Sequence, residues 1–475
     1  MTPLGAVDRR QLLIGALALG GAAALGGCAQ EQPSVQAAEG RKAQSPFGER
    51  EVDVLVIGAG IAGLAAAQHV VGSGRSCAVL EARDRVGGRI WTTGAWSDAP
   101  VDLGASWLHG TDGNPVYDEI NRLGIATTVF DVGSFEGAGS AEYYAPDGTP
   151  LDADEIDARV TAVVAALEHT AGDDEASRTS MRAALDALPA GLREQARETE
   201  VAAALTDYAA DFGATPGDLA LSALDEEDSY DGPQRALPGG FGQLTQRLAD
   251  ELPVRLATRV TAVSLRDRDH VLVDTDTGQW RASKVIVTVP LGVLQSGAVR
   301  FDPPLPAAHT SAIRRLGMGR YEKLVLLFDA AFWDDVDQIQ VLGRPGEPFT
   351  GWYNLNRAVG RPALMALSGG AAGAKADDLT LPQKTAAAAD QLARIYGDRF
   401  RPPVDSQASN WWDDEFSRGS YSFTAVGSGE SDREALAEPI DDRLWLAGEA
   451  SHPTFHSTVH GGWFSGRAAA EQATS

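Results

Sequence analysis

The sequence predicts an α/β fold: a doubly wound, mainly parallel sheet beside a second part of mixed α+β structure. The first observation is a β-branched run, Glu51 to Ile57, that passes through a glycine-rich turn into a helical stretch and then into a second apolar strand ending at Glu81. Such a strand–helix–strand unit places its two strands parallel in one sheet. The second is that helical residues 151–230, rich in Ala, Asp and Glu, precede a strand-rich stretch from Thr258 onward.

Composition limits the classes of function. The chain has 475 residues, 44% hydrophobic and 22% charged, as expected for a soluble globular protein with a sizeable core. Its net charge of −26 opposes nucleic-acid binding, which needs a basic face, and favours a cationic partner. The two cysteines, Cys28 and Cys77, are too few for a disulfide framework or a cysteine-built metal site, and we expect no bound metal.

Residues 1–28 are predicted to be an export signal. Arg9 and Arg10 precede an apolar run, Leu12 to Leu25, that is too short for a typical transmembrane helix. The paired arginines resemble a twin-arginine signal, and Leu25 to Cys28 resembles a bacterial lipobox. We expect a cell-envelope lipoprotein on the outer face of a bacterial cytoplasmic membrane, with lipid on Cys28 as its only membrane contact. The alternative is an ordinary cleaved signal. Polar residues 29–50 form the linker.

The glycine-rich turn has the pattern of a dinucleotide-binding loop. Its first glycine allows the tight turn, its second lets the backbone approach a pyrophosphate, and its third allows close helix–strand packing. A helix N-terminus favours the negative charge. Glu81, which ends the second strand, can accept both ribose hydroxyls. A glycine-rich turn in another α/β domain would leave Glu81 unexplained. The predicted contacts in the turn are Gly58, Gly60, Ile61, Ala62 and Gly63.

Two further segments distinguish a flavin from a nicotinamide. Residues 81–89 continue from the acid into a basic, glycine-bearing loop, whose amides and arginines could hold a second phosphate and a ribityl chain. Residues 102–110, Asp-Leu-Gly-Ala-Ser-Trp-Leu-His-Gly, follow. Together these ordered motifs resemble the flavin-containing amine oxidases, and within them the spermine-type polyamine oxidases, from about residue 51 to 470.

The resemblance implies FAD, bound without a covalent link, because Ser420 stands where some relatives have a cysteine. It implies an FAD-binding domain from residues 51–110, 231–300 and 406–475, and a substrate-binding domain from residues 111–230 and 301–405. It also implies further cofactor contacts: Ala82, Arg83, Gly88, Arg89, Gly104, Ala105, Ser106, Trp107, Val260, Gly448, Glu449, Thr458 and Val459.

The resemblance places four residues near the reacting centre. Lys323 interrupts an apolar strand and would hold a water near flavin N5; an edge lysine reaching solvent is the alternative. Phe455, where many relatives have tyrosine, and Trp411 would wall the amine, and His109 would lie along the substrate tunnel. Ordinary packing is the alternative for each of these three.

The resemblance therefore implies oxidation of a primary or secondary amine, with polyamines as the expected substrate, to an imine that hydrolyses to an aldehyde and an amine. O2 would be reduced to H2O2. One alternative is an L-amino-acid oxidase, which needs an arginine for the carboxylate. The other is a non-catalytic polyamine-binding surface lipoprotein. The acidic run Asp225 to Asp228 could attract a distal ammonium, or it is a solvated face. The arginines that remain candidates for the carboxylate are Arg314, Arg315, Arg357 and Arg361.

Overall fold

The structure is a computed structural model that describes residues 50–130, 140–171, 175–225 and 230–475. The predicted export signal, its lipobox and nearly all of the linker lie outside the described residues, as does most of the acidic run 225–228. Within the described ranges, no helix has both the length and the apolar character needed to cross a membrane.

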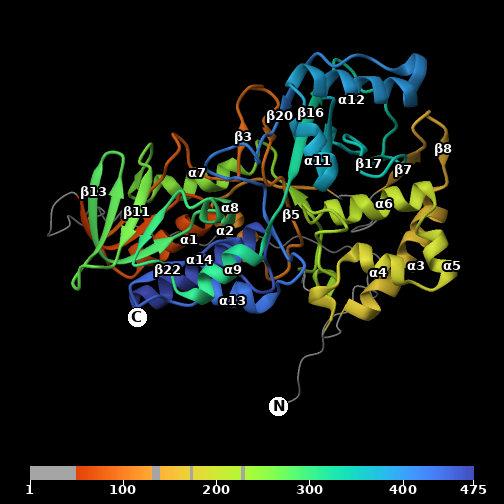
Figure 1. Cartoon of the computed structure of the whole chain (residues 1–475). Helices are drawn as coiled ribbons and strands as arrows, with labels where there is room; N and C mark the ends of the chain where they lie inside the picture. The colour runs from red at the N-terminus through yellow and green to blue at the C-terminus, as the bar shows by residue number, and fades with distance from the viewer. Residues whose placement is uncertain (1–49, 131–139, 172–174, 226–229) are drawn as a thin grey trace, which may run out of the picture. The chain divides into compact units, whose positions relative to one another are not determined.

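The first sheet has eight strands and contains the predicted strand–helix–strand unit (Figure 1). Its central strands β2, β1, β13 and β22 run parallel, and the β1–β2 pair is joined by a crossover through α1. β13 is long: its apolar second half pairs with β1 and β22, and its first half pairs with antiparallel β12. In spatial order the strands are β10 (Val254–Arg255), β2 (Cys77–Leu80), β1 (Glu51–Ile57), β13 (Gly278–Val287), β12 (Val271–Thr275), β11 (Val260–Ser264) and β14 (Arg300–Asp302), with β22 (Leu444–Leu446) beside β13.

Helices α1 (Ile61–Gly72) and α14 (Val459–Thr474) pack closely against each other on this sheet. The approach requires glycine: a Cβ on Gly466 would lie 2.0 Å from the carbonyl oxygen of Ala62, and one on Gly462 would lie 2.9 Å from Ile61 Cγ2. The first turns of the two helices therefore lie side by side, although about 400 residues separate them in the sequence. Both helices begin at the edge of the sheet where β1 and β22 end.

The second sheet has seven strands, all antiparallel neighbours except the parallel pair β17 and β7. Alternate residues of β16 face opposite sides: Leu324 and Leu326 pack toward α12 (Leu381–Tyr396), whereas Val325 and Leu327 pack toward residues 96–103 and Phe130. The strands are, in spatial order, β20 (Asp405–Ala408), β16 (Tyr321–Leu327), β19 (Ala363–Gly369), β18 (Gly351–Asn354), β17 (Gln338–Val341), β7 (Ala141–Tyr144) and β8 (Pro150–Leu151).

A helical layer follows β8 and contains α3 (Ala153–Ala171), α4 (Met181–Ala187), α5 (Ala190–Gln195) and α6 (Thr199–Ala210). The other elements are β3 (Thr92–Thr93), β4 (Val101–Asp102), β5 (Trp107–Leu108), α2 (Pro115–Arg122), β6 (Thr128–Val129), β9 (Arg235–Ala236), α7 (Gly242–Asp250), α8 (Leu291–Gln295), α9 (Ala307–Arg315), β15 (Gly317–Met318), α10 (Asn356–Val359), α11 (Gly370–Asp377), β21 (Ser422–Phe423) and α13 (Glu430–Ala437), with short 3-10 turns at 176–178, 221–225, 397–399 and 449–451.

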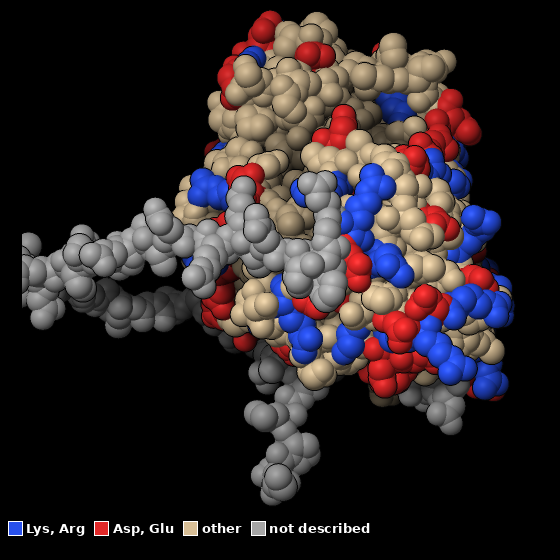
Figure 2. All heavy atoms as spheres, turned by 90° about the vertical axis from the view of Figure 1, so that its left-hand side faces the viewer, with Lys and Arg blue, Asp and Glu red and all other residues tan. Residues whose placement is uncertain are grey.

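The parallel and antiparallel sheets with their helices confirm the predicted fold class. Both sheets are assembled from separate stretches of chain. The predicted domain boundary between residues 405 and 406 falls inside β20, which pairs with β16 in the second sheet; the division into two domains stays a prediction. On the face in Figure 2, acidic and basic side chains are interspersed, so on that face the net negative charge is not gathered into one patch.

Candidate functional site

The glycine-rich turn forms where β1 meets α1. Gly58 has a φ of +105°, and a Cβ there would lie 2.6 Å from Thr288 Oγ1, so only glycine fits. Gly60 precedes α1 and supplies no side-chain cap, and neither α1 nor α14 has an acidic residue in its first turn. Both helices therefore present N-terminal amides and positive dipole ends at one edge of the sheet, where an anionic group is favoured.

Glu81 is buried at the end of β2, 6% exposed. Its carboxylate accepts hydrogen bonds from the Ala59 amide at 2.8 Å and from the Arg83 amide at 2.9 Å. Its backbone oxygen accepts from the Thr258 amide at 2.8 Å, which brings Val260 and β11 to the same end of the site. The structure thus gathers the predicted adenosine-end residues, 58–63, 81–83 and Val260.

The guanidinium of Arg83 is engaged elsewhere. It donates to both carboxylate oxygens of Asp414, at 2.7 and 2.6 Å, and to Ser417 Oγ at 2.8 Å. This bidentate pair holds residues 414–417 against residues 81–83. A contact between Arg83 and a phosphate stays a prediction.

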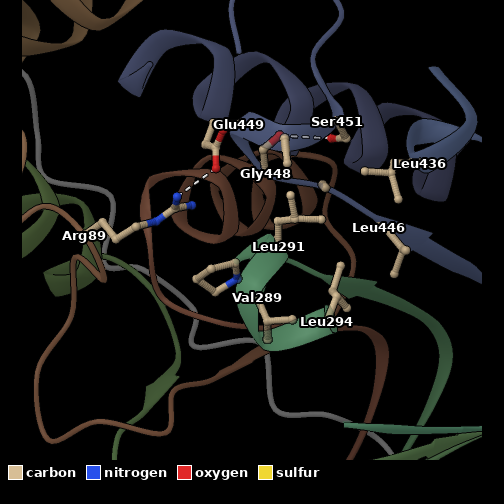
Figure 3. A pocket seen from close by; sticks show the side chains of 12 residues that line it. Arg89, Val289, Leu291, Leu294, Leu436, Leu446, Gly448, Glu449 and Ser451 are labelled. Atoms are coloured by element: carbon tan, nitrogen blue, oxygen red, sulfur yellow. Dashed lines mark hydrogen bonds and ion pairs between the residues drawn. The ribbon is translucent and has the colours of Figure 1, made fainter. Parts of the chain in front are cut away.

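Arg89 and Glu449 form a part-buried ion pair with a separation of 2.7 Å between Nη1 and Oε1 (Figure 3). Burial alone would raise the pKa of Glu449, but the charge of Arg89, hydrogen bonds from Ser422 and Arg89, and the charge of Arg433 lower that pKa to about 2. The pair borders a small pocket with apolar walls from α8 and α13. The pocket lining also includes Val289, Pro290 and residues 446–451.

Lys323 reaches across from the second sheet to the segment 102–107. Its ammonium donates to the carbonyl oxygen of Gly104 at 2.5 Å and to Ser106 Oγ, and lies 5.0 Å from the centre of the Trp107 ring. Lys323 is only 8% exposed, so it is not an edge lysine reaching solvent. Burial lowers its pKa, and the nearby carboxylate of Asp102 opposes that shift.

Phe455 lies in an aromatic cluster, and His109 lies close enough to His460, a member of this cluster, to influence its charge. Its ring stacks on Tyr230 with centroids 5.3 Å apart and meets His460 edge-on at 5.0 Å. Burial, together with the neighbouring His109 and His452, lowers the pKa of His460 to about 3. His460 is therefore neutral at physiological pH, which leaves this end of the site without a fixed imidazolium charge.

Trp411 lies against the segments that contain Trp91 and Leu103 and is 5% exposed. Its indole donates to the carbonyl oxygen of Leu103 at 2.9 Å, and its backbone amide donates to Glu322 Oε1 at 2.7 Å. Burial raises the pKa of Glu322 to about 7, while the Ser409 hydroxyl opposes the shift. Trp411 thus lies next to the segment that Lys323 contacts. Its ring packs against Trp91 and not against the rings that surround Phe455.

A family model described as flavin containing amine oxidoreductase matches residues 61–474. The chain belongs to this family. Its residues fit FAD: the glycine turn, Glu81 and two helix N-termini suit an ADP group, and Arg89, Glu449 and the 102–107 segment continue the site toward Lys323. FAD is therefore the cofactor, and it is held without a covalent bond. Ser420 offers only a hydroxyl, which donates to the Gly319 carbonyl oxygen at 3.0 Å.

Several relatives of this amine oxidoreductase are known. It is 34% identical over 446 residues to a rice protein named lysine-specific histone demethylase 1 homolog 1, covering 87% of this chain and 51% of that one. It is 32% identical to polyamine oxidase 2 of Arabidopsis thaliana, covering 89% of this chain and 88% of that one. The chain spans about half the length of the demethylase-type relatives. A solved putrescine oxidase variant shares the fold with a TM-score of 0.73 at 22% identity, covering 89% and 99% of the two chains.

Sequence reasoning missed several residues of this amine oxidoreductase site. Asp102, Glu322, Tyr230 and His460 each contact or influence a predicted residue, yet they were not selected. The sequence contains a signal for Glu322: it stands beside Lys323 in an apolar strand, and two adjacent strand residues point to opposite faces of the sheet. Tyr230 had none, because its contact with Phe455 joins residues 225 positions apart.

We expect Glu449→Gln to lower the free energy of unfolding by about 3 kcal/mol at neutral pH. The folded-state pKa of about 2 lies below the ordinary value of 4.5, so the ionised carboxylate stabilises the fold above pH 4.5. That contribution is lost as the pH falls from 4.5 toward 2, so the difference from the wild type should shrink across this window. Urea unfolding at a series of pH values with excess FAD measures it. Exposed Glu434→Gln on α13 is the control, and a pH-independent difference would contradict the assignment.

Proposed function

We propose that the protein oxidises a primary or secondary amine, with polyamines as the substrate class, and releases an aldehyde, an amine and H2O2. The observation that carries this proposal is the buried ammonium of Lys323, held by Gly104 and Ser106 within the FAD-binding segments. Burying a lysine charge costs free energy, so its presence at this point favours a functional role. The polyamine oxidase relatives and the acidic composition support the substrate class.

FAD, when bound, accepts the two electrons of the C–H bond beside nitrogen and passes them to O2. The chain supplies position, desolvation and proton control. Lys323 offers donors that hold a water beside the reacting carbon, where water must later attack the imine. The neutral His460 and the stacked rings of Phe455 and Tyr230 exclude bulk water without adding positive charge. The amine must reach the flavin site in its neutral form, because its nitrogen lone pair drives the transfer.

The structure disfavours an L-amino-acid oxidase. Arg314 is exposed, and Arg315 pairs with Asp432. The other two candidates also pair with surface acids: Arg357 with Asp335 and Asp337, and Arg361 with Asp98. Arg315, Arg357 and Arg361 are thus already neutralised by acids in exposed or partly exposed ion pairs. None of the four is a buried arginine held ready for a substrate carboxylate.

A substrate screen coupled to peroxide detection tests the function. Polyamines and diamines should generate H2O2 together with an aldehyde, whereas L-amino acids should not. The same protein reconstituted with FAD and no amine is the baseline. Peroxide from amino acids alone would support the amino-acid oxidase instead. A flavin-loaded protein that binds spermidine without producing peroxide would support the non-catalytic alternative.

Lys323→Met should retain the fold and FAD but slow anaerobic reduction of the bound flavin about tenfold or more, equivalent to about 1.4 kcal/mol at the barrier. Methionine keeps most of the side-chain length and removes the charge and the donors. Stopped-flow absorbance of the flavin measures the rate. Lys375→Met on α11, an exposed lysine near Glu347, is the matched control. An unchanged reduction rate would remove Lys323 from the mechanism.

We also propose that the protein is exported and anchored through lipid on Cys28, on the strength of the sequence at residues 8–13 and 25–28. Cys28→Ser should move the protein from the membrane fraction to the soluble fraction of the expressing bacterium, while peroxide-forming activity is kept. Cys77→Ser is the matched control, because Cys77 lies in β2 of the folded part. Unchanged membrane fractionation of Cys28→Ser would contradict the lipid anchor.

A further inference from the structure

Two buried glutamines lie in the second sheet with an unsatisfied acceptor each. Gln338 is 3% exposed and Gln340 is 7% exposed. In the described part of the chain, the Oε1 atom of each has no hydrogen-bond partner. A buried acceptor left without a donor costs about 1–3 kcal/mol, so two on one strand call for an explanation.

The strand register places these glutamines on the face that carries Lys323. Lys323 lies opposite Leu367, Leu367 opposite Gly351, and Gly351 opposite Gln340. Side chains of directly opposite residues share a face of the sheet. Gln340 is therefore in the same cross-strand row as Lys323, three strands away, which corresponds to about 14 Å between their Cα atoms. Gln338 is two residues earlier on the same strand and the same face.

Gly351 leaves space for the Gln340 amide. A Cβ on Gly351 would lie 3.3 Å from Gln340 Oε1 and 3.5 Å from its Nε2. The amide therefore lies over the backbone of β18, displaced from its own strand in the direction of β16 and Lys323. A larger residue at position 351 would crowd this amide.

Helix α6 covers the same face and brings a carboxylate to it. A Cβ on Gly369, which lies opposite Tyr321, would be 2.3 Å from the carbonyl oxygen of Ala210 at the end of α6. Among the residues that the structure describes, the carboxylate of Asp207 on α6 accepts one hydrogen bond, a long one of 3.4 Å from Thr350, the residue before Gly351. Burial raises the pKa of Asp207 to about 7, so its surroundings do not yet compensate its charge.

We propose that Gln338, Gln340 and Asp207 form a distal subsite that binds the remote ammonium of a long diamine or polyamine, while the reacting nitrogen lies beside Lys323. An ammonium carries three donors and no acceptor, which matches two amide oxygens and a carboxylate. The bound cation would satisfy both glutamine oxygens and pair with Asp207. The inference rests on the proposed amine oxidation, and it adds the residues that would select a substrate by its length.

The position of the subsite sets a length requirement. A saturated chain spans about 1.2 Å per bond when extended, by analogy with the extended backbone. A short diamine such as diaminobutane cannot join Lys323 to the glutamines, whereas spermidine, spermine and diamines of eight or more carbons approach the required span. Selectivity should therefore appear as a dependence on chain length that a monoamine does not show.

The test compares kcat/KM for α,ω-diamines, from diaminobutane to diaminododecane, with n-alkylamines of equal length. In the wild type, the ratio of kcat/KM for the diamine to kcat/KM for the monoamine of equal length should rise about tenfold or more from the short to the long members. Asp207→Asn and Gln340→Leu should flatten this rise and leave kcat/KM for the monoamines unchanged. Asp186→Asn on α4, an exposed acid paired with Arg197, is the matched control and should keep the wild-type pattern.

Gly351→Ala provides a second variant, because it displaces the Gln340 amide without changing any charge; it should also flatten the rise. Flavin absorbance after gel filtration confirms that each variant is folded and loaded with FAD. A length dependence that persists in all three variants would overturn the subsite. Equal rates with long diamines and monoamines in the wild type would also overturn it, while leaving amine oxidation intact. Failure of every amine to reduce the flavin would instead refute the proposed function.

Discussion

The ion pair between Arg89 and Glu449 joins two ends of the chain, 360 residues apart, at the point where the cofactor must lie. Burial opposes the charge on Glu449, and Arg89, Ser422 and Arg433 together maintain it. Breaking one side would leave a buried charge unpaired, which is costly in a low-dielectric interior. The glycine contact between α1 and α14 acts at the same edge of the sheet. It brings two helix N-termini together, so the anionic site is complete only when both chain ends are in place.

The second constraint is the burial of Lys323. Its strand belongs to the second sheet, yet its ammonium is bound by the backbone of Gly104 and by Ser106, which lie in a segment predicted to bind FAD. The residue therefore joins the second sheet to the segment 102–107. Its neighbour Glu322 points to the opposite face and holds the amides of Trp411 and Trp412. Two adjacent charges in one strand thus position two different parts of the site.

Three carboxylates of the molecule, those of Asp102, Glu322 and Asp207, have a pKa raised above the ordinary range, and burial is the largest cause in each case. They differ in what satisfies them. Asp102 accepts from Thr92 and from the Phe241 amide, and Glu322 accepts from Ser409 and two backbone amides. Within the described residues, the Asp207 carboxylate accepts a single long hydrogen bond, which is why we assign the cationic ligand to it.

Local sequence determined the parts of this protein whose chemistry depends on short spacing. The glycine turn, Glu81, the basic loop at 81–89 and the apolar strand around Lys323 could all be predicted, because each needs particular residues within a few positions. They were sufficient for the fold class, the cofactor and the family. The predicted contact between Arg83 and the cofactor shows the limit of local sequence. The structure pairs Arg83 with Asp414, a residue 331 positions away, and short spacing cannot reveal such a partner.

Only the tertiary structure decided which side chains meet. The stacking of Tyr230 on Phe455, the row from Lys323 to Gln340 and the contact of Asp207 with Thr350 all depend on strand register and helix placement. A strand pattern tells which residues share a face of one strand, but not which strand lies beside it. The burial of a side chain likewise follows only from the tertiary packing. A glutamine or aspartate becomes an unsatisfied acceptor only when packing removes it from water.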